Sequence, residues 1–146
     1  MNTFEKSVKI KLNSTIQPID GEPENYEMWL NGSYINKAGK TYLRYEEVLD
    51  DKSIQTTVKM DNLQALILRS GGVKMRLPFN SEKQESGHYD TQFGTLPILT
   101  ETHQLTHDHE EEHGINGNFK VQYDLIISGQ SVGKYTLEIH YSEGQK

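Results

Sequence analysis

The chain contains no cysteine among its 146 residues. Disulfide bonds and thiolate metal sites are therefore excluded. A chain without cysteine fits a reducing compartment, so a cytoplasmic location is the natural expectation.

Long apolar segments are also missing. No stretch approaches the roughly 20 apolar residues that a helix needs to cross a bilayer. The first residues, MNTFEKSVKIKLNST, have no apolar run between their charges and do not resemble a secretory signal. We therefore expect no membrane partner.

Basic residues are too few to balance the acidic ones. The chain has 15 Lys and Arg residues against 21 Asp and Glu residues, which gives a formal net charge of -6. Nucleic-acid binding needs Lys and Arg to neutralise phosphates, and anionic lipids attract basic segments. The charge argues against both as partners.

Apolar residues make up only 34% of the chain, and the mean hydropathy is -0.74. Disordered chains can be this polar, but they lack aromatic residues and periodic apolar positions. This chain has eight Tyr, four Phe and one Trp. Because a sheet with one solvated face needs apolar residues at only about half of its positions, the composition favours an all-β protein.

Apolar and polar residues alternate along much of the chain. Val8, Ile10 and Leu12 are separated by lysines, which is the period of a half-buried strand. The same alternation over residues 119–127 and 135–141, joined by a turn in GQSVG, predicts a C-terminal hairpin. Helical periodicity is nearly absent.

Turn residues separate the remaining strands. NKAGK, Asp61-Asn62 and Gly71-Gly72 each mark a change of direction. The stretch HYDTQFGTLPILTETHQL is expected to form one long strand, with a bulge or bend at Gly94 and Pro97.

Consecutive strands with short turns and no crossover helices predict an antiparallel meander. Closing such a sheet removes its edges, and closure near eight strands leaves room for side chains or one small ligand. We predict a single all-β domain over residues 1–146, a closed barrel of about eight strands. Its core is expected at about 6–141, and a His- and Glu-rich loop at about 107–117.

Four segments in order, YEEV, LILRSGGVKMRLPF, HYDTQFGTLPILTETHQL and VQYDLIISGQSVGKYTLEI, resemble the YwiB-like family. These are small bacterial proteins of unknown function. The resemblance runs from about Lys6 to Tyr141. Its most specific part is Tyr89-x-Thr91-x-x-Gly94-x-Leu96, followed by Thr102 and the hairpin from Tyr123 to Ile139. It implies a calycin-like, lipocalin-type β-barrel, in agreement with the meander, and it implies no established catalytic or binding residues.

The segment HEEEH, His109 to His113, matches the H-E-x-x-H motif of zinc proteases. That motif works on a helix packed against the core, with a third protein ligand to the zinc. No apolar residue lies between Leu105 and Ile115, so a helix there would bury nothing. We therefore predict a solvated loop and no protease.

His103, His107, His109 and His113 are all odd-numbered, so an extended chain would place them on one face. A helix would instead pair them four residues apart. Either arrangement could bind a divalent cation with the help of nearby Glu carboxylates, and this is the remote alternative. The prediction is a charged loop without a metal site, and no cofactor is expected.

The barrel interior offers a second candidate site. If Leu43 faces inward, alternation places Glu47 inward, and alternation from Ala65 does the same for Arg69. Buried charges must be paired or must meet a ligand. The candidate ligand-binding residues are Glu47, Arg69, Tyr89 and Thr91. In the alternative, the two charged residues lie at strand ends in solvent or simply pair with each other.

The function that these observations favour is non-enzymatic binding of a small, partly apolar molecule in the barrel. The alternative is a protein-interaction module or homodimer with a filled barrel and no small ligand. No catalytic group can be identified in the sequence.

Overall fold

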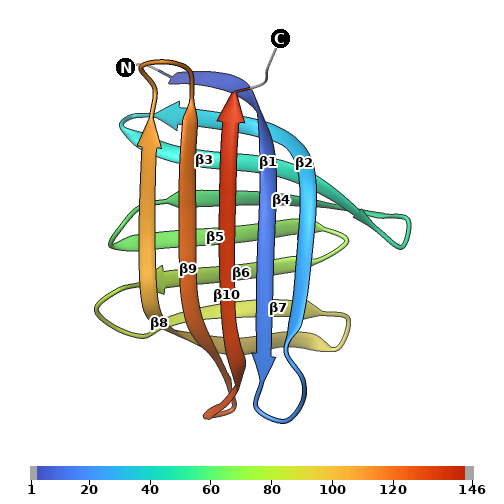
Figure 1. Cartoon of the computed structure of the whole chain (residues 1–146). Coiled ribbons are helices and arrows are strands. Elements are labelled where there is room, and N and C mark those ends of the chain that lie inside the picture. Colours follow the sequence, from blue (N-terminus) through green and yellow to red (C-terminus); the bar gives the residue numbers. More distant parts are fainter. Residues whose placement is uncertain (1–2, 144–146) are drawn as a thin grey trace.

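The computed structural model describes residues 3–143, which form ten antiparallel β-strands (Figure 1). None of these residues belongs to a helix that is long and apolar enough to span a membrane. The strands are β1 (Thr3–Pro18), β2 (Glu24–Lys37), β3 (Lys40–Leu49), β4 (Lys52–Met60), β5 (Gln64–Gly71), β6 (Lys74–Asn80), β7 (Glu85–Thr91), β8 (Gly94–Glu110), β9 (Asn116–Ile127) and β10 (Gln130–Glu143).

The sheet closes on itself. Each strand pairs with its neighbours in sequence, and β1 also pairs with β10. This arrangement confirms the predicted all-β fold, the antiparallel meander and the closed barrel.

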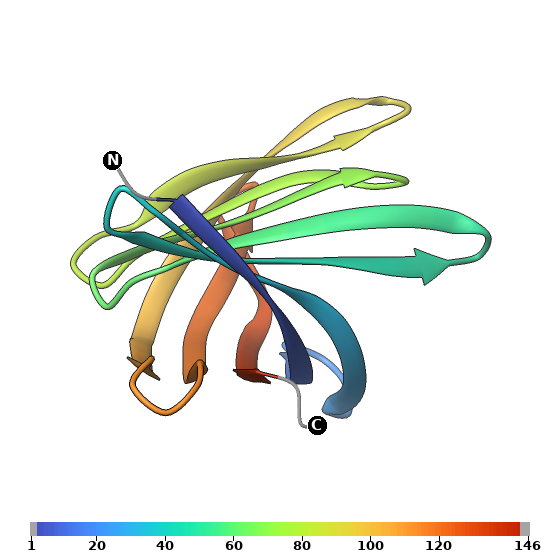
Figure 2. The same cartoon turned by 90° about the horizontal axis from the view of Figure 1, so that it is seen from above.

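The barrel is flattened into two layers. The long strands β8, β9, β10, β1 and β2 run lengthwise at the front of Figure 1, and β3 to β7 run across them behind. Seen from above in Figure 2, the hairpins of the rear layer project beyond the front layer on one side. The core lies between the two layers.

The structure has ten strands and not the expected number of about eight, in part because one predicted strand is two. The stretch that begins at His88 forms most of β7 and then β8, with a turn at Gln92 and Phe93. Thr91 pairs with Gly94, whose φ of 125° lies in the region that favours glycine. Gly94 therefore begins the second strand of a hairpin and does not mark a bulge.

Alternation places the core as predicted. On β1, Val8, Ile10 and Leu12 are buried and the lysines between them are exposed. Aromatic and branched side chains from all around the barrel meet inside, and the largest fully buried ones are Tyr34, Tyr141, Phe79, Phe119, Ile10, Leu43, Ile54 and Ile139.

Three hairpins turn on two residues with positive φ, the geometry that matches the twist of the paired strands. These pairs are Ala38-Gly39 (53° and 79°), Asp50-Asp51 (50° and 65°) and Ser128-Gly129 (54° and 80°). The C-terminal hairpin therefore turns at the start of the predicted segment GQSVG, whose first residue is Gly129. The rest of that stretch begins β10, where a register shift lies between Ser131 and Gly133.

Replacing Ala38 by Asn is expected to stabilise the protein by roughly 0.5–1 kcal/mol, because a left-handed conformation is costly for alanine and asparagine tolerates it. Asn-Gly is also the preferred pair for such a turn. Urea denaturation would measure the change. Ala38→Val is the control and should lower stability, and equal effects of the two variants would contradict the explanation.

Candidate ligand-binding cavity

The barrel is hollow at one end and packed at the other. A cavity of about 490 Å³ lies between the lower parts of β1, β2, β9 and β10 and the rear strands. Its lining residues are Leu12, Ser14, Ile16, Tyr26, Met28, Tyr45, Glu47, Thr56, Ile67, Arg69, Met75, Leu77, Tyr89, Leu96, Ile98, Tyr123, Leu125, Ile127, Tyr135, Thr136 and Leu137. The interior is therefore not filled by side chains at this end.

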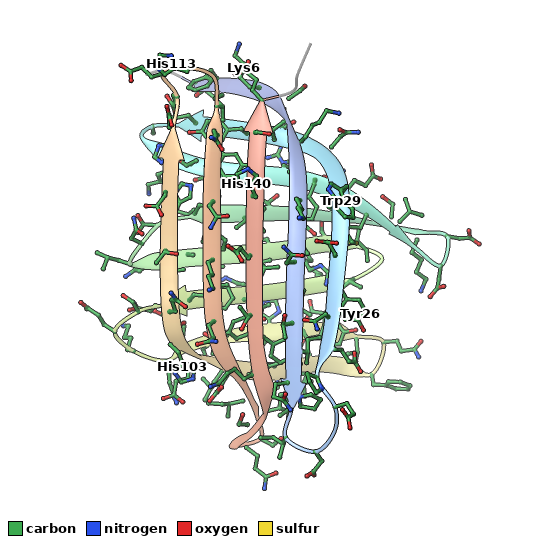
Figure 3. The ribbon with its side chains drawn as sticks, viewed as in Figure 1. Lys6, Tyr26, Trp29, His103, His113 and His140 are labelled. Carbon is green, nitrogen blue, oxygen red and sulfur yellow. The ribbon has the colours of Figure 1, made fainter. Side chains whose placement is uncertain are left out.

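The cavity lies beside a split between β2 and β3. These strands pair only over Gly32–Lys37 and Lys40–Tyr45. Among the described residues, the part of β2 before Gly32 pairs with β1 alone. Tyr26, on this part of β2, lines the cavity and is 52% exposed, so it lies at the rim (Figure 3).

Gly32 lies where β2 begins to pair with β3. A β-carbon at this position would lie 2.6 Å from the Arg44 carbonyl oxygen and 2.6 Å from Ile10 Cδ1. The close contact of the strands at the inner end of the split therefore depends on the missing side chain.

Glu47 and Arg69 both face the cavity and pair with each other. Arg69 Nη2 donates to Glu47 Oε1 at 2.9 Å, and their side chains are 26% and 12% exposed, respectively. Each residue lies shortly before a hairpin turn, Glu47 in β3 and Arg69 in β5. Both side chains therefore face inward, as alternation predicts. They also pair with each other, which was one of the two alternatives.

A row of inward side chains crosses the rear layer at the level of Arg69. Tyr45 on β3 lies opposite Thr56 on β4, which lies opposite Arg69 on β5. Arg69 in turn lies opposite Met75 on β6. The row continues to Tyr89 on β7. Every member lines the cavity.

Thr56 is the unusual member of this row. Its side chain is 2% exposed, and its Oγ1 has no hydrogen-bond partner within residues 3–143. A buried hydroxyl without a partner lowers stability, so the Thr56 hydroxyl at the cavity wall is available for a hydrogen bond to a ligand.

Two tyrosines add hydroxyl groups to the same region. Burial raises the pKa of Tyr45 and the pKa of Tyr123, and the nearby Arg69 guanidinium opposes both shifts. Both phenols therefore stay protonated at neutral pH and can donate hydrogen bonds.

The predicted ligand-binding residues divide into two groups. Glu47, Arg69 and Tyr89 line the cavity together, but Thr91 does not. The Thr91 side chain is exposed in the β7–β8 turn, where its hydroxyl donates to the Gly94 carbonyl and accepts from the Phe93 amide. It stabilises the turn, and the structure places it outside the site.

The histidine segment is mostly strand. β8 continues to Glu110, so the connecting loop covers 111–115 and not the predicted 107–117. The common face that a regular extended chain would give the four histidines is not formed either, because a register shift between Thr102 and Gln104 turns His103 to the outside. There His103 Nε2 lies 3.2 Å from Asp124 Oδ2.

His107, in contrast, is buried in the packed end of the barrel. Its Nε2 lies 2.8 Å from the Tyr141 hydroxyl, and its ring stacks on His109 at 4.9 Å between centroids. Asn62 makes hydrogen bonds with both backbone groups of His107. Burial and the nearby His109 lower the pKa of His107 to about 4.

The loop after β8 is tied to this packed end. The Tyr34 hydroxyl donates to Glu111 Oε2 at 2.5 Å, and burial with this contact raises the pKa of Tyr34 to about 12. The Ile115 amide donates to Glu143 Oε1 at 3.0 Å. The loop thus covers the end opposite the cavity.

The zinc-protease arrangement is not formed. The motif begins at the end of a strand and continues into a loop, so it has no helical turn to align its histidines. His103 lies near the bottom of the barrel in Figure 3, and His113 lies in the loop at the top. Within the described part of the chain, no three His, Asp or Glu side chains gather closely enough to hold a metal ion.

The sequence does not identify every residue of the cavity. Thr56 lies two residues before Val58 in SIQTTVKM, so alternation is a signal that could have placed it inward. The packed cluster of His107, Tyr141 and Tyr34 carried no comparable signal, since its members are far apart in the chain.

Comparisons with known proteins agree with this architecture. A family model described as a domain of unknown function, DUF1934, matches residues 10–139. The uncharacterized β-barrel protein YwiB of Bacillus subtilis (strain 168) is 30% identical over 140 residues, 96% of this chain and 96% of the relative. The crystal structure of ywiB protein from Bacillus subtilis matches with a TM-score of 0.84 and 30% identity, covering 97% of this chain and 94% of that chain. The predicted family resemblance is confirmed: the chain belongs to the DUF1934 family, whose function is unknown.

Proposed function

We propose that the protein binds a small, partly apolar molecule in the barrel cavity and does not act as an enzyme. The observation that carries the proposal is the cavity itself, which is mostly apolar and contains one ion pair. Its volume of about 490 Å³ falls within the range of about 300–1,000 Å³ that is usual for small-molecule sites. A few convergent polar groups in an apolar pocket are also typical of such sites.

Accessibility supports the same proposal. The split between β2 and β3 leaves the cavity without a paired strand on one side, and partly exposed residues such as Tyr26 form its rim. A ligand could enter there without unpairing the strands that close the barrel.

Filling the cavity should abolish binding. In Leu96→Trp, the indole would occupy space that the ligand needs, so we expect at least a tenfold loss of affinity for a neutral apolar dye, roughly 1.4 kcal/mol. Fluorescence titration with a neutral, environment-sensitive naphthylamine dye would measure it.

Leu68→Trp is the matched control, because Leu68 lies on the outer face of β5 and is 41% exposed. It should bind the dye as the wild type does. Equal binding by the wild type and both variants would place the dye outside the cavity, and absence of binding by the wild type would contradict the proposal.

A second candidate is self-association through the part of β2 before Gly32. Within residues 3–143 this edge pairs with β1 only, and Trp29, on the same part of the strand, is 68% exposed. Unpaired strand edges are templates for pairing with another chain. Sedimentation velocity would test this candidate, and a monomer at all concentrations would contradict it.

The proposal assigns no role to nucleic acid or to a membrane surface, because the net charge of -6 repels both. The lack of cysteine supports a reducing compartment such as the cytoplasm as the place of binding.

A further inference from the structure

The charge of the cavity wall limits the chemistry of what can bind there. Of the 21 lining residues, only Glu47 and Arg69 carry formal charges, and they are paired. The wall is therefore neutral overall, but it presents a carboxylate and a guanidinium next to each other.

A charged head group would upset this balance. A ligand carboxylate at Arg69 would lie beside the Glu47 carboxylate, and like charges in a poorly solvated site repel strongly. Glu24 adds negative charge near the rim, where it accepts a hydrogen bond from Tyr26 at 2.8 Å. Burial raises the pKa of Tyr135, and the Glu24 carboxylate adds to that shift. A ligand ammonium group at Glu47 would in turn meet the Arg69 guanidinium.

A neutral head group with a donor and an acceptor would satisfy the same wall. Arginine has five N–H donors, and within residues 3–143 the hydrogen bond to Glu47 is the one that its side chain makes. The remaining N–H groups can donate to a ligand oxygen. The Glu47 carboxylate can accept from a ligand N–H or O–H.

Thr56 supplies independent support for a polar head group at this level. Its unpartnered Oγ1 lies in the row between Tyr45 and Arg69. A ligand polar atom beside Arg69 would also lie within reach of Thr56. The deeper wall is apolar and includes Leu12, Leu77 and Ile98, so it can hold only an apolar body.

We propose that the cavity selects an uncharged amphiphile, an apolar body whose head group carries donor and acceptor together, as a primary carboxamide does. The head group lies against Glu47, Arg69 and Thr56, and fatty carboxylates and alkyl amines bind more weakly. This inference rests on the proposed function, because it names the ligand class of the same cavity.

Three ligands with the same tail test the inference: decanamide, decanoate and decylamine. Each competes with the naphthylamine dye for the wild-type protein at about pH 7.5, where the last two are charged. We expect decanamide to bind at least about tenfold more tightly than either charged ligand.

Glu47→Gln should change this order. It preserves the size of the side chain and a carbonyl acceptor for Arg69 but leaves the guanidinium charge unopposed, so the affinity for decanoate should rise by about tenfold or more. Glu46→Gln is the matched control, because Glu46 is exposed on the other side of β3 and bonds to Ser53. It should preserve the wild-type order.

Thr56→Val tests the third contact. It removes the hydroxyl and retains the shape, so decanamide affinity should fall by about threefold or more. The empty protein should unfold at an equal or higher temperature, because a buried hydroxyl without a partner has been removed. Unchanged decanamide affinity would overturn the placement of the head group beside Thr56.

The outcomes separate the inference from the function on which it rests. Wild-type preference for decanoate, or an unchanged order in Glu47→Gln, would overturn the inference and leave cavity binding intact. Failure of the dye and all three ligands to bind would overturn both. Thermal unfolding of each variant verifies that altered binding does not reflect loss of the fold.

Discussion

Gly117→Ala is expected to destabilise the protein by about 3 kcal/mol, because the space beside Gly117 is occupied by a ring that cannot move. Gly117 pairs with Tyr141 on β10. A β-carbon at this position would overlap the Tyr141 hydroxyl oxygen and Cζ and lie 2.8 Å from Cε1. Tyr141 is fully buried between His107 and Tyr34, so the ring has nowhere to shift. Urea denaturation would measure the loss.

A second substitution identifies the cause. Tyr141→Leu alone should also destabilise, since it empties part of the core. In the double variant the new methyl group has space, so the combined cost should fall below the sum of the two single costs by at least about 1 kcal/mol. If the costs of the two single variants simply added, the Tyr141 ring would not be the reason why position 117 requires glycine.

Acidification between about pH 6.5 and pH 4 is expected to remove about 3 kcal/mol of stability through His107 alone. Its pKa is lowered from 6.5 to about 4 by burial, and by the nearby His109. Between these two pH values the unfolded chain binds a proton that the folded chain does not bind. The contribution is therefore fully present above pH 6.5, is lost as the pH falls, and changes no further below about pH 4.

The groups around His107 do not reverse the direction of this pH dependence. Tyr141 faces it with a hydroxyl, and Asp108 and Asp61 raise its pKa by less than burial and His109 lower it. Stability should therefore be measured by urea denaturation across the range for the wild type, for His107→Gln and for His103→Gln. His107→Gln should flatten the profile, and His103→Gln should not, because His103 is exposed. Identical profiles for wild type and His107→Gln would contradict the assignment.

Alternation predicts an inward orientation for Glu47 and Arg69, because side chains of a strand alternate between its faces. The alternative, in which both lie at strand ends in solvent, is excluded only by their place in the cavity wall. Their contact could not be derived in the same way. It depends on the register that carries Glu47, Thr56 and Arg69 onto three adjacent strands. Register is set by turn geometry and by the whole core, neither of which can be read from one segment.

Irregular positions account for the errors. The split of one predicted strand into β7 and β8 depends on the turn at Gln92-Phe93, which lacks the usual Asn-Gly or Asp-Gly pair. The segment predicted as a charged loop is largely strand, yet the common face that an extended chain would give the four histidines is not formed. A single register shift at His103 puts this residue on the opposite face from His107. Thr91 follows Tyr89 by two residues, so alternation alone would put both on one face. β7 ends at Thr91, however, and its hydroxyl bonds within the same turn.

The sequence by itself determined that the chain is all-β, that it forms an antiparallel meander, and which strand positions face the core. These features follow from local alternation and turn residues, which act over a few positions. Only the tertiary structure decided that ten strands close the barrel, that β2 pairs with β3 only from Gly32 onward, that Glu47 and Arg69 meet in the cavity wall, that one end is hollow and that His107 is buried. These features depend on how distant strands fill a common interior, because whether side chains meet or leave a cavity is decided by packing among all of them.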